Sequence, residues 1–441
     1  MISNINAETG QRPHGYAIKT ADFLNSIGLC SSISKRGEML EKTVSCAKYT
    51  GIRWFRAGYE GNVSTDDIIS LYKQTGAKTS YGLLSGGSDI DRLIKGGEEL
   101  AKAGALLSFE GPNEPNNWSI KHKGREGGRN LSWLPVAELQ RDMYSAVKNN
   151  PILKDYPVFS IGGESGAQTD NAGLQFLTIP EGADTLMPPG KKFADYANIH
   201  NYFCHPTLGG VIDNMTWHAA DPILVTVPGN GGSYDHLYGN YGKMWGGGKF
   251  TGYSKEELKI LPRVTTETGI QIGSYNNTVD EELHGRMLAC MYLSQFTRGF
   301  DYTAVYLLRD RTDESGNQQF GFYRPDYTPR KAADYLHNMT AVLNQYDNFA
   351  DSEYFNYSVL NQPETVHDLL LQKNKGEFYL AVWNERFTGG QDSVNINFDN
   401  VCKTINIYDI TVGTQPIRSL NGISSLQINL SDHPVIVEII L

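Results

Sequence analysis

Two glutamates are placed where they could act together on one substrate. Glu114 lies in the run Ser108-Phe-Glu-Gly-Pro-Asn-Glu-Pro115, and Glu267 lies in the run Val264-Thr-Thr-Glu-Thr-Gly269. Each ends a short apolar stretch of the kind that forms a buried strand. Two facing carboxyl groups, one protonated and one ionised, are what cleavage of a glycosidic bond requires. Either glutamate alone could instead be a solvated or arginine-paired charge.

These glutamates need a scaffold that brings strand ends together. Between residues 26 and 346, short apolar runs alternate with amphipathic segments, as in a parallel sheet with crossover helices. Eight such units in about 320 residues predict an α/β fold, the (β/α)8 TIM barrel, for which ~250 residues are typical. Its active site lies at the carboxyl ends of the strands. The predicted strands are 26–32, 52–56, 78–84, 105–110, 157–161, 196–201, 263–267 and 303–308.

The C-terminal part of the chain has a different pattern. From residue 347 to residue 441, short alternating or apolar runs are separated by Gly, Asn, Asp and Pro, without a convincing helix. We therefore predict a barrel over residues 1–346, with an N-terminal extension, and an all-β sandwich over residues 347–441. The segment before about Asp22 is expected to pack against the sandwich or to cap the base of the barrel.

Composition excludes several kinds of partner. The formal net charge of −10 argues against nucleic acid and against anionic membranes, because both repel an acidic surface. No stretch approaches the ~20 apolar residues that span a bilayer. No signal peptide is visible before Pro13. We expect either a cytoplasmic protein or, preferably, a secreted or periplasmic chain whose signal peptide has been removed.

The sequence predicts neither a metal nor a cofactor. The five cysteines are scattered and form no CxxC pair, which predicts buried free thiols and no zinc site or disulfide framework. The histidines of the segment 204–253 match no metal-binding spacing. No phosphate-binding glycine loop, dinucleotide fingerprint or nucleophile elbow is present.

The strand-end motifs resemble those of a known group of enzymes. Asn113-Glu114-Pro115 at the end of the fourth strand, with Glu267 at the end of the seventh, resembles glycoside hydrolase clan A, the retaining barrel glycosidases. The longer motif ending in Pro115 and the C-terminal sandwich look most like the xylosidase/iduronidase-type families, which are family 39-like. The resemblance implies that Glu114 is the general acid/base and Glu267 the nucleophile of a double displacement. The substrate would be an oligo- or polysaccharide.

The resemblance also implies roles for the residues around this pair. Asn113 would bind the 2-hydroxyl of the sugar, a contact that strengthens in the transition state. Tyr202 would hold the nucleophile, and His200 would line the sugar subsite, unless both simply pack inside the barrel. Arg56, at the exit of the second strand, would neutralise the floor of the pocket and depress the pKa of Glu267.

Two further acidic residues lie near strand ends. Glu110 precedes Glu114 by four residues, and this even offset points both side chains to one side of the sheet. Glu110 lies deeper, so we expect it to form an ion pair with Arg53 or Arg56. Glu164 follows the fifth strand and is a candidate for a sugar subsite, with loop surface as the alternative.

Aromatic residues supply candidates for sugar contacts. The connection 204–253 has few credible regular elements and follows the sixth strand, so we expect a long loop on the catalytic face. In it, Trp217 and Trp245 could stack on sugar rings, or its aromatics could form a small core of their own. Tyr306, near the exit of the eighth strand, is a further candidate for sugar contact.

The pairing leads to two physical expectations. The carboxyl groups of Glu114 and Glu267 should lie ~5–5.5 Å apart, as in retaining enzymes, and not the ~6.5–9.5 Å of inverting ones. The charge of Glu267 should then raise the pKa of Glu114. A carbohydrate-binding protein on a disabled barrel and a transglycosylase remain alternatives. The presence of both glutamates, with Asn113 and Tyr202, argues against the first alternative.

Overall fold

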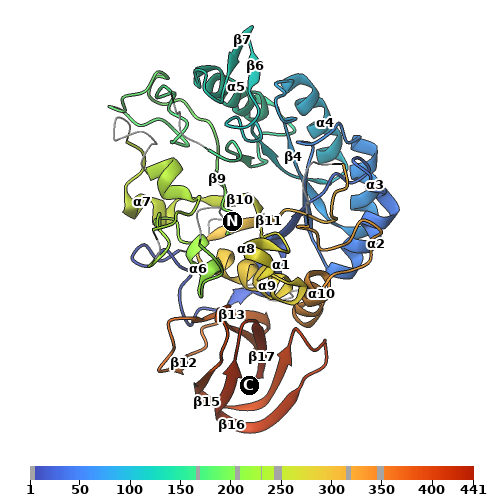
Figure 1. The fold of residues 1–441 in the computed structure, drawn as a ribbon, viewed down its shortest axis with the longest axis vertical. Helices are drawn as coiled ribbons and strands as arrows, with labels where there is room; N and C mark the ends of the chain where they lie inside the picture. Colours follow the sequence, from blue (N-terminus) through green and yellow to red (C-terminus); the bar gives the residue numbers. More distant parts are fainter. Residues whose placement is uncertain are drawn as a thin grey trace.

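The computed structural model describes residues 5–164, 169–203, 209–229, 231–242, 251–313, 319–344 and 352–441. Its larger part is a ring of parallel strands surrounded by helices (Figure 1). A parallel bridge between Phe159 and Tyr196 joins the two edge strands, β8 and β9. The predicted (β/α)8 barrel is therefore confirmed. The strands, in chain order, are β2 (Ile27–Cys30), β3 (Trp54–Ala57), β4 (Lys78–Gly82), β5 (Leu106–Glu110), β8 (Val158–Phe159), β9 (Ala197–His200), β10 (Arg263–Thr268) and β11 (Phe300–Val305).

The helices cover the outside of this ring. In α3 the Ser64 hydroxyl accepts a hydrogen bond from the Asp67 N–H at the first turn, and Gly76 ends the helix at φ 75°. No helix among the described residues has the length and apolar character that crossing a membrane requires. The main helices are α1 (Thr20–Ser26), α2 (Leu40–Thr50), α3 (Thr65–Thr75), α4 (Ile90–Lys102), α5 (Leu134–Asn149), α9 (Glu281–Thr297) and α10 (Lys331–Leu343).

The described part of the segment 204–253 forms much of the sixth crossover. It includes α6 (Met215–Ala219) and the π-helical turn η1 (Tyr238–Gly242), and α7 (Lys255–Ile260) then leads to β10. Tyr241 is fully buried, and its hydroxyl lies 3.1 and 3.3 Å from the backbone nitrogen and oxygen of Asn198 in β9. These residues therefore cover the outside of the barrel, which differs from the expected long loop on the catalytic face. Trp245 lies outside the described residues.

The C-terminal part forms the predicted sandwich. Its strands join in one sheet that folds over, because the first half of β15 pairs with β12 and the second half with β17. Alternate residues of β14 point into the sandwich core and toward the barrel, so both faces of this strand are buried. For this reason its sequence contains a continuous apolar run and does not alternate with polar residues. The strands are β12 (Tyr357–Leu360), β13 (Val366–Asn374), β14 (Glu377–Asn384), β15 (Asp392–Asp409), β16 (Arg418–Leu430) and β17 (Pro434–Ile440).

The N-terminal segment also belongs to this sheet. The short strand β1 (Ile18–Lys19) pairs in parallel with β13. This confirms that the segment before about Asp22 packs against the sandwich, but it moves β1 out of the predicted barrel unit 1–346. The expected boundary at residues 346 and 347 lies outside the described residues. The four cysteines that the structure describes are buried free thiols, as expected.

A buried carboxylate joins the barrel to the sandwich. Glu385, directly after β14, accepts hydrogen bonds from the N–H groups of Thr216 and Trp217, both at 3.0 Å. The hydroxyls of Thr216 and Ser294 donate to it at 2.6 and 2.7 Å. The Thr216 and Trp217 N–H groups lie in the first turn of α6 and have no partners within the helix. Burial raises the pKa of Glu385, an effect that these donors oppose.

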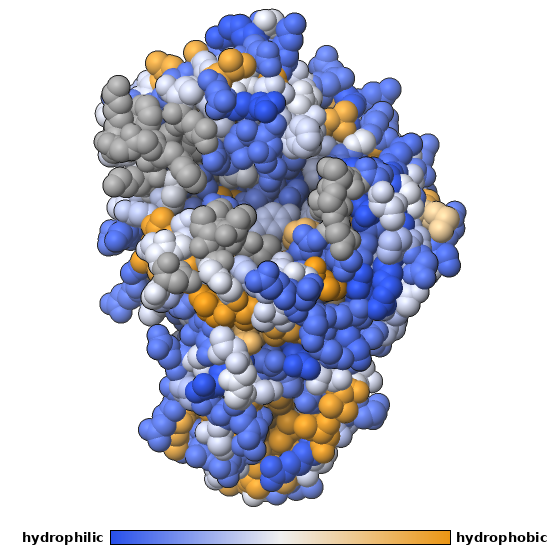
Figure 2. Space-filling view, in the orientation of Figure 1, coloured by the Kyte–Doolittle hydropathy of each residue, from blue (hydrophilic) through white to orange (hydrophobic). Residues whose placement is uncertain are grey.

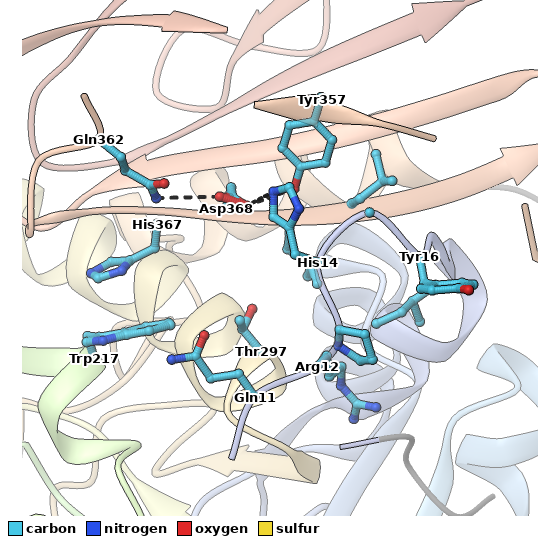
Figure 3. Close-up of a pocket in the computed structure, with 15 residues that line it drawn as sticks. Gln11, Arg12, His14, Tyr16, Trp217, Thr297, Tyr357, Gln362, His367 and Asp368 are labelled. Carbon is cyan, nitrogen blue, oxygen red and sulfur yellow. Dashed lines mark hydrogen bonds and ion pairs between the residues drawn. The ribbon is translucent and has the colours of Figure 1, made fainter. Parts of the chain in front are cut away.

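A cavity of about 220 Å³ lies beside this contact, between the N-terminal segment, the end of α9 and the sandwich (Figure 3). Trp217 borders it. The indole stacks on His367 with 3.8 Å between ring centroids, and the Arg298 guanidinium lies 4.2 Å from the indole centroid. Two groups so close to one ring must cover its opposite faces. Trp217 is therefore part of the domain interface, which corrects its prediction as a sugar platform.

The first prediction concerns the stability of this interface. Glu385→Ala leaves several buried donors without an acceptor, and we expect it to lower the free energy of unfolding by at least about 3 kcal/mol. Glu385→Gln keeps one carbonyl oxygen and should cost less. Urea unfolding followed by tryptophan fluorescence measures both variants. Equal stability of Glu385→Ala and the wild type would contradict the assigned role.

Candidate active site

An arginine inside the barrel holds three residues of the site. Arg56 lies in β3 and is fully buried. Its guanidinium donates to the two oxygens of Glu110 at 2.7 and 2.6 Å, to Oδ1 of Asn113 at 2.7 Å, and to Glu267. A buried cation is costly unless it is paired, so these acceptors and the arginine stabilise one another. The predicted ion pair of Glu110 with Arg56 is confirmed.

Glu267, in β10, has a donor on each carboxylate oxygen. Arg56 donates to Oε1, and the Tyr202 hydroxyl donates to Oε2 at 2.9 Å. Burial raises the pKa of Glu267 and the charge of Glu114 adds to this, whereas the charges of His200 and Arg56 lower it. Arg56 thus acts in the expected direction, but burial outweighs its effect.

Glu114 lies on a tight turn directly after β5. Its φ of 39° is uncommon for a residue with a side chain, and its N–H donates to the carbonyl of Gly162 at 3.0 Å. The carboxylate accepts a hydrogen bond from Nδ2 of Asn117 at 2.8 Å and contacts Nδ1 of His200 at 2.8 Å. Its side chain is 21% exposed.

The pKa of Glu114 contradicts the expectation from the sequence. Burial raises this pKa, but the hydrogen bond and charge of His200, the Asn117 hydrogen bond and the charge of Arg56 outweigh burial and lower it to about 2. The expected raised pKa considered only the repulsion from Glu267. The direct contact with His200 has the larger effect.

A hydrogen-bond chain fixes the hydrogen-bond roles of the His200 ring. Its Nε2 lies 3.1 Å from Oγ1 of Thr266, and that oxygen lies 2.9 Å from Oε1 of Glu110. The Thr266 hydroxyl has one hydrogen, which we assign to Glu110 because a carboxylate is the stronger acceptor. Nε2 must then donate to Thr266. Nδ1 of His200 and the carboxylate of Glu114 consequently share one proton, which can reside on either group.

Thr266 is a site residue that the sequence did not predict. Strict alternation would place Thr266 and Glu267 on opposite faces of the strand. However, the register of β10 shifts against β9 between Val264 and Glu267, and against β11 between Thr265 and Thr268. This irregularity lets both side chains reach the site. A bulge of this kind leaves no signal in the residue types.

The other predicted residues are placed as follows. Tyr306 borders the site, with its ring centroid 6.5 Å from that of Tyr202. Phe320, which the sequence did not indicate, packs on both rings. Glu164 is half-buried and lies close in sequence to Gly162, the partner of the Glu114 N–H. Hydrogen bonds and ion pairs connect six of the predicted residues into one site: Arg56, Asn113, Glu114, His200, Tyr202 and Glu267.

Three of these residues also carry groups that can bind a metal ion. Among the described residues, Glu114, His200 and Glu267 offer one ligand atom each, all within 4.8 Å of one another. Arg56 and Tyr202 already donate to both oxygens of Glu267, and a neighbouring guanidinium repels a cation. The arrangement therefore suits proton transfer better than metal binding.

In the space-filling view, the molecule is hollowed near the centre of the barrel, where hydrophilic residues prevail (Figure 2). Polar residues around such a hollow suit a polar ligand that contacts several strand ends. This agrees with the hydrogen-bonding side chains of the site, which come from the ends of β3, β5, β9 and β10.

The fold is similar to that of solved glycoside hydrolases. A 4-O-α-L-rhamnosyl-β-D-glucuronidase from Fusarium oxysporum 12S matches 98% of this chain and 98% of its own, with a TM-score of 0.59 and 12% identity. A family 39 glycoside hydrolase from Bacteroides cellulosilyticus WH2 matches 95% of this chain and 82% of its own, with a TM-score of 0.55 and 15% identity. A family 39 β-xylosidase from Caulobacter crescentus matches 96% of this chain and 97% of its own, with a TM-score of 0.52 and 10% identity.

No protein-family model and no curated protein matches the sequence. At these low identities the solved structures show the fold alone. They share the fold that the resemblance of the strand-end motifs to family 39-like members of clan A implies.

The second prediction concerns Asn117. Because its amide stabilises the ionised form of Glu114, Asn117→Ala should raise the pKa of that carboxyl group above about 2. The ¹³C shift of the carboxyl, assigned with Glu114→Gln, measures this. Asn116→Ala is the matched control, since the Asn116 side-chain oxygen has no hydrogen-bond partner among the described residues. An unchanged or lowered pKa in Asn117→Ala would refute the assignment.

Proposed function

We propose that the protein is a retaining glycoside hydrolase that cleaves O-glycosidic bonds of an oligo- or polysaccharide. The observation that carries this proposal is the pair Glu114 and Glu267 at the carboxyl ends of barrel strands. One carboxylate oxygen of Glu114 lies within 4.8 Å of one carboxylate oxygen of Glu267. Such a separation suits direct attack by a carboxylate and leaves too little room for the water that inversion places between the two groups. Similarity to solved glycosidases supports the same reaction class.

Glu267 is proposed as the nucleophile. The donors on its two oxygens orient the carboxylate and favour its ionised form, and Arg56 supplies the positive charge. Attack on the anomeric carbon forms a covalent glycosyl-enzyme and breaks the bond to the leaving oxygen. Tyr202 keeps the attacking oxygen aligned through its hydrogen bond.

Glu114 is proposed as the general acid and, in the second step, the general base. Its pKa of about 2 describes the state in which the shared proton resides on Nδ1 of His200. To act as an acid, Glu114 must take this proton back. A sugar hydroxyl that replaces the carboxylate as the partner of His200 would remove the main cause of the low pKa. Substrate binding would then create the protonated acid in the place where it is needed.

Asn113 is proposed to bind the 2-hydroxyl of the reacting sugar. Its Oδ1 accepts from Arg56, and its Nδ2 donates to the Ser85 hydroxyl at 3.1 Å. This fixes the orientation of the amide. The second hydrogen on Nδ2 can then serve a sugar hydroxyl, whose contact strengthens as the oxocarbenium ion develops.

A transglycosylase would use the same residues and differ in whether water or a sugar reaches the glycosyl-enzyme. A binding protein without activity would have no need for a nucleophile with two donors opposite an acid that shares a proton. We therefore favour hydrolysis, with transfer as a side reaction.

The third prediction is that Glu267→Gln loses turnover. The amide keeps the shape of the side chain but is a much weaker nucleophile, so kcat should fall by roughly 10⁴-fold or more. A screen of aryl glycosides and oligosaccharides measures activity, and circular dichroism checks the fold. Glu438→Gln, at a carboxylate of the sandwich hydrogen-bonded to Tyr379 and Tyr408, is the control and should retain activity. Substantial activity in Glu267→Gln would indicate a different nucleophile.

A further inference from the structure

One tryptophan close to Glu114 is left exposed. Trp118 exposes 54% of its surface, whereas Trp54, Trp133 and Trp383 are fully buried. An indole is large and mostly apolar, and burying it is strongly favourable. An exposed indole beside a site is therefore a candidate for contact with a ligand.

The backbone holds Trp118 at a fixed place relative to Glu114. The N–H groups of Asn117 and Trp118 both donate to the carbonyl oxygen of Glu114, at 2.8 Å each. The carbonyl of Pro115 in turn accepts a hydrogen bond from the N–H of Arg129 at 2.7 Å. Trp118 thus lies one turn of chain from Glu114, on a segment that hydrogen bonds fix at both ends of the turn.

The chain is equally well held after Trp118. The hydroxyl of Ser119 donates to Glu126 at 2.8 Å, and Ile120 is buried. Ile120 begins β6 (Ile120–His122), which pairs with β7 (Arg125–Gly127). The backbone on both sides of the exposed indole is therefore ordered, and this favours a preformed contact surface.

The proposed reaction determines which part of the substrate meets this surface. The general acid protonates the oxygen that leaves, so the departing sugar lies on the side of Glu114, while the retained sugar becomes bonded to Glu267. The backbone of Trp118 lies one turn of chain from Glu114, within side-chain reach of a departing sugar. The face of an indole packs well against the C–H face of a sugar ring.

We propose that Trp118 forms the subsite for the departing sugar. This inference rests on the proposed function and narrows the substrate class to glycosides whose leaving group is itself a sugar. The same subsite can hold a sugar acceptor when the glycosyl-enzyme is resolved, which gives transfer as the side reaction.

The experiment compares a substrate that has a leaving-group ring with one that has none. The first probes are xylotriose and β-D-xylosyl fluoride. If the wild type hydrolyses neither, an oligosaccharide and the glycosyl fluoride of other sugars are tried in turn until a hydrolysed sugar is found. Trp118→Ala should lower kcat/KM for the oligosaccharide by about 10–100-fold. The glycosyl fluoride should be hydrolysed within about twofold of the wild-type rate, because fluoride makes no ring contact.

Two further variants sharpen the test. Trp118→Phe keeps an aromatic face and should recover part of the loss. Ile260→Ala, at a side chain of α7 that is 52% exposed, should affect neither substrate. Equal losses on both substrates, or no loss on either, would overturn the inference while leaving the proposed function intact. A wild-type protein that hydrolyses none of these glycosides would overturn both.

Discussion

The site depends on one buried positive charge. Arg56 is surrounded by Glu110, Glu267 and Asn113, so the negative charge of two carboxylates is stabilised in a part of the barrel that excludes water. Burial raises the pKa of Glu267, and the charge of Arg56 opposes this rise. Glu110 uses both of its oxygens on Arg56, whereas Glu267 keeps one for Tyr202. This difference separates a structural carboxylate from the one that we propose as the nucleophile.

A shared proton is the second constraint. Glu110 accepts a hydrogen bond from the Thr266 hydroxyl, and Thr266 in turn accepts one from Nε2 of His200. Nδ1 of the same ring shares one proton with Glu114. The floor of the site is thereby linked to the proposed acid, Glu114, at its rim. The low pKa of Glu114 and its acid role are compatible if the sugar takes over the contact with His200.

Much of the barrel was predictable, since buried parallel strands read as apolar runs and active sites lie where such strands end. Arg56, His200 and Tyr202 lie at these ends, and their roles were implied by the resemblance to clan A. Three features required contacts that residue types do not reveal. The bulge in β10 brings Thr266 inward, the contact with His200 reverses the expected pKa shift of Glu114, and the crossover after β9 carries Trp217 to the sandwich.

Covalent trapping of the glycosyl-enzyme tests the central claim most directly. Activated 2-deoxy-2-fluoro glycosides of the sugar that the wild type hydrolyses slow the second step, so that the intermediate accumulates. Mass spectrometry of peptides should locate the sugar on Glu267, and NMR of the natural reaction should show the product with retained anomeric configuration. A label on Glu114, or an inverted product without any label, would contradict the account.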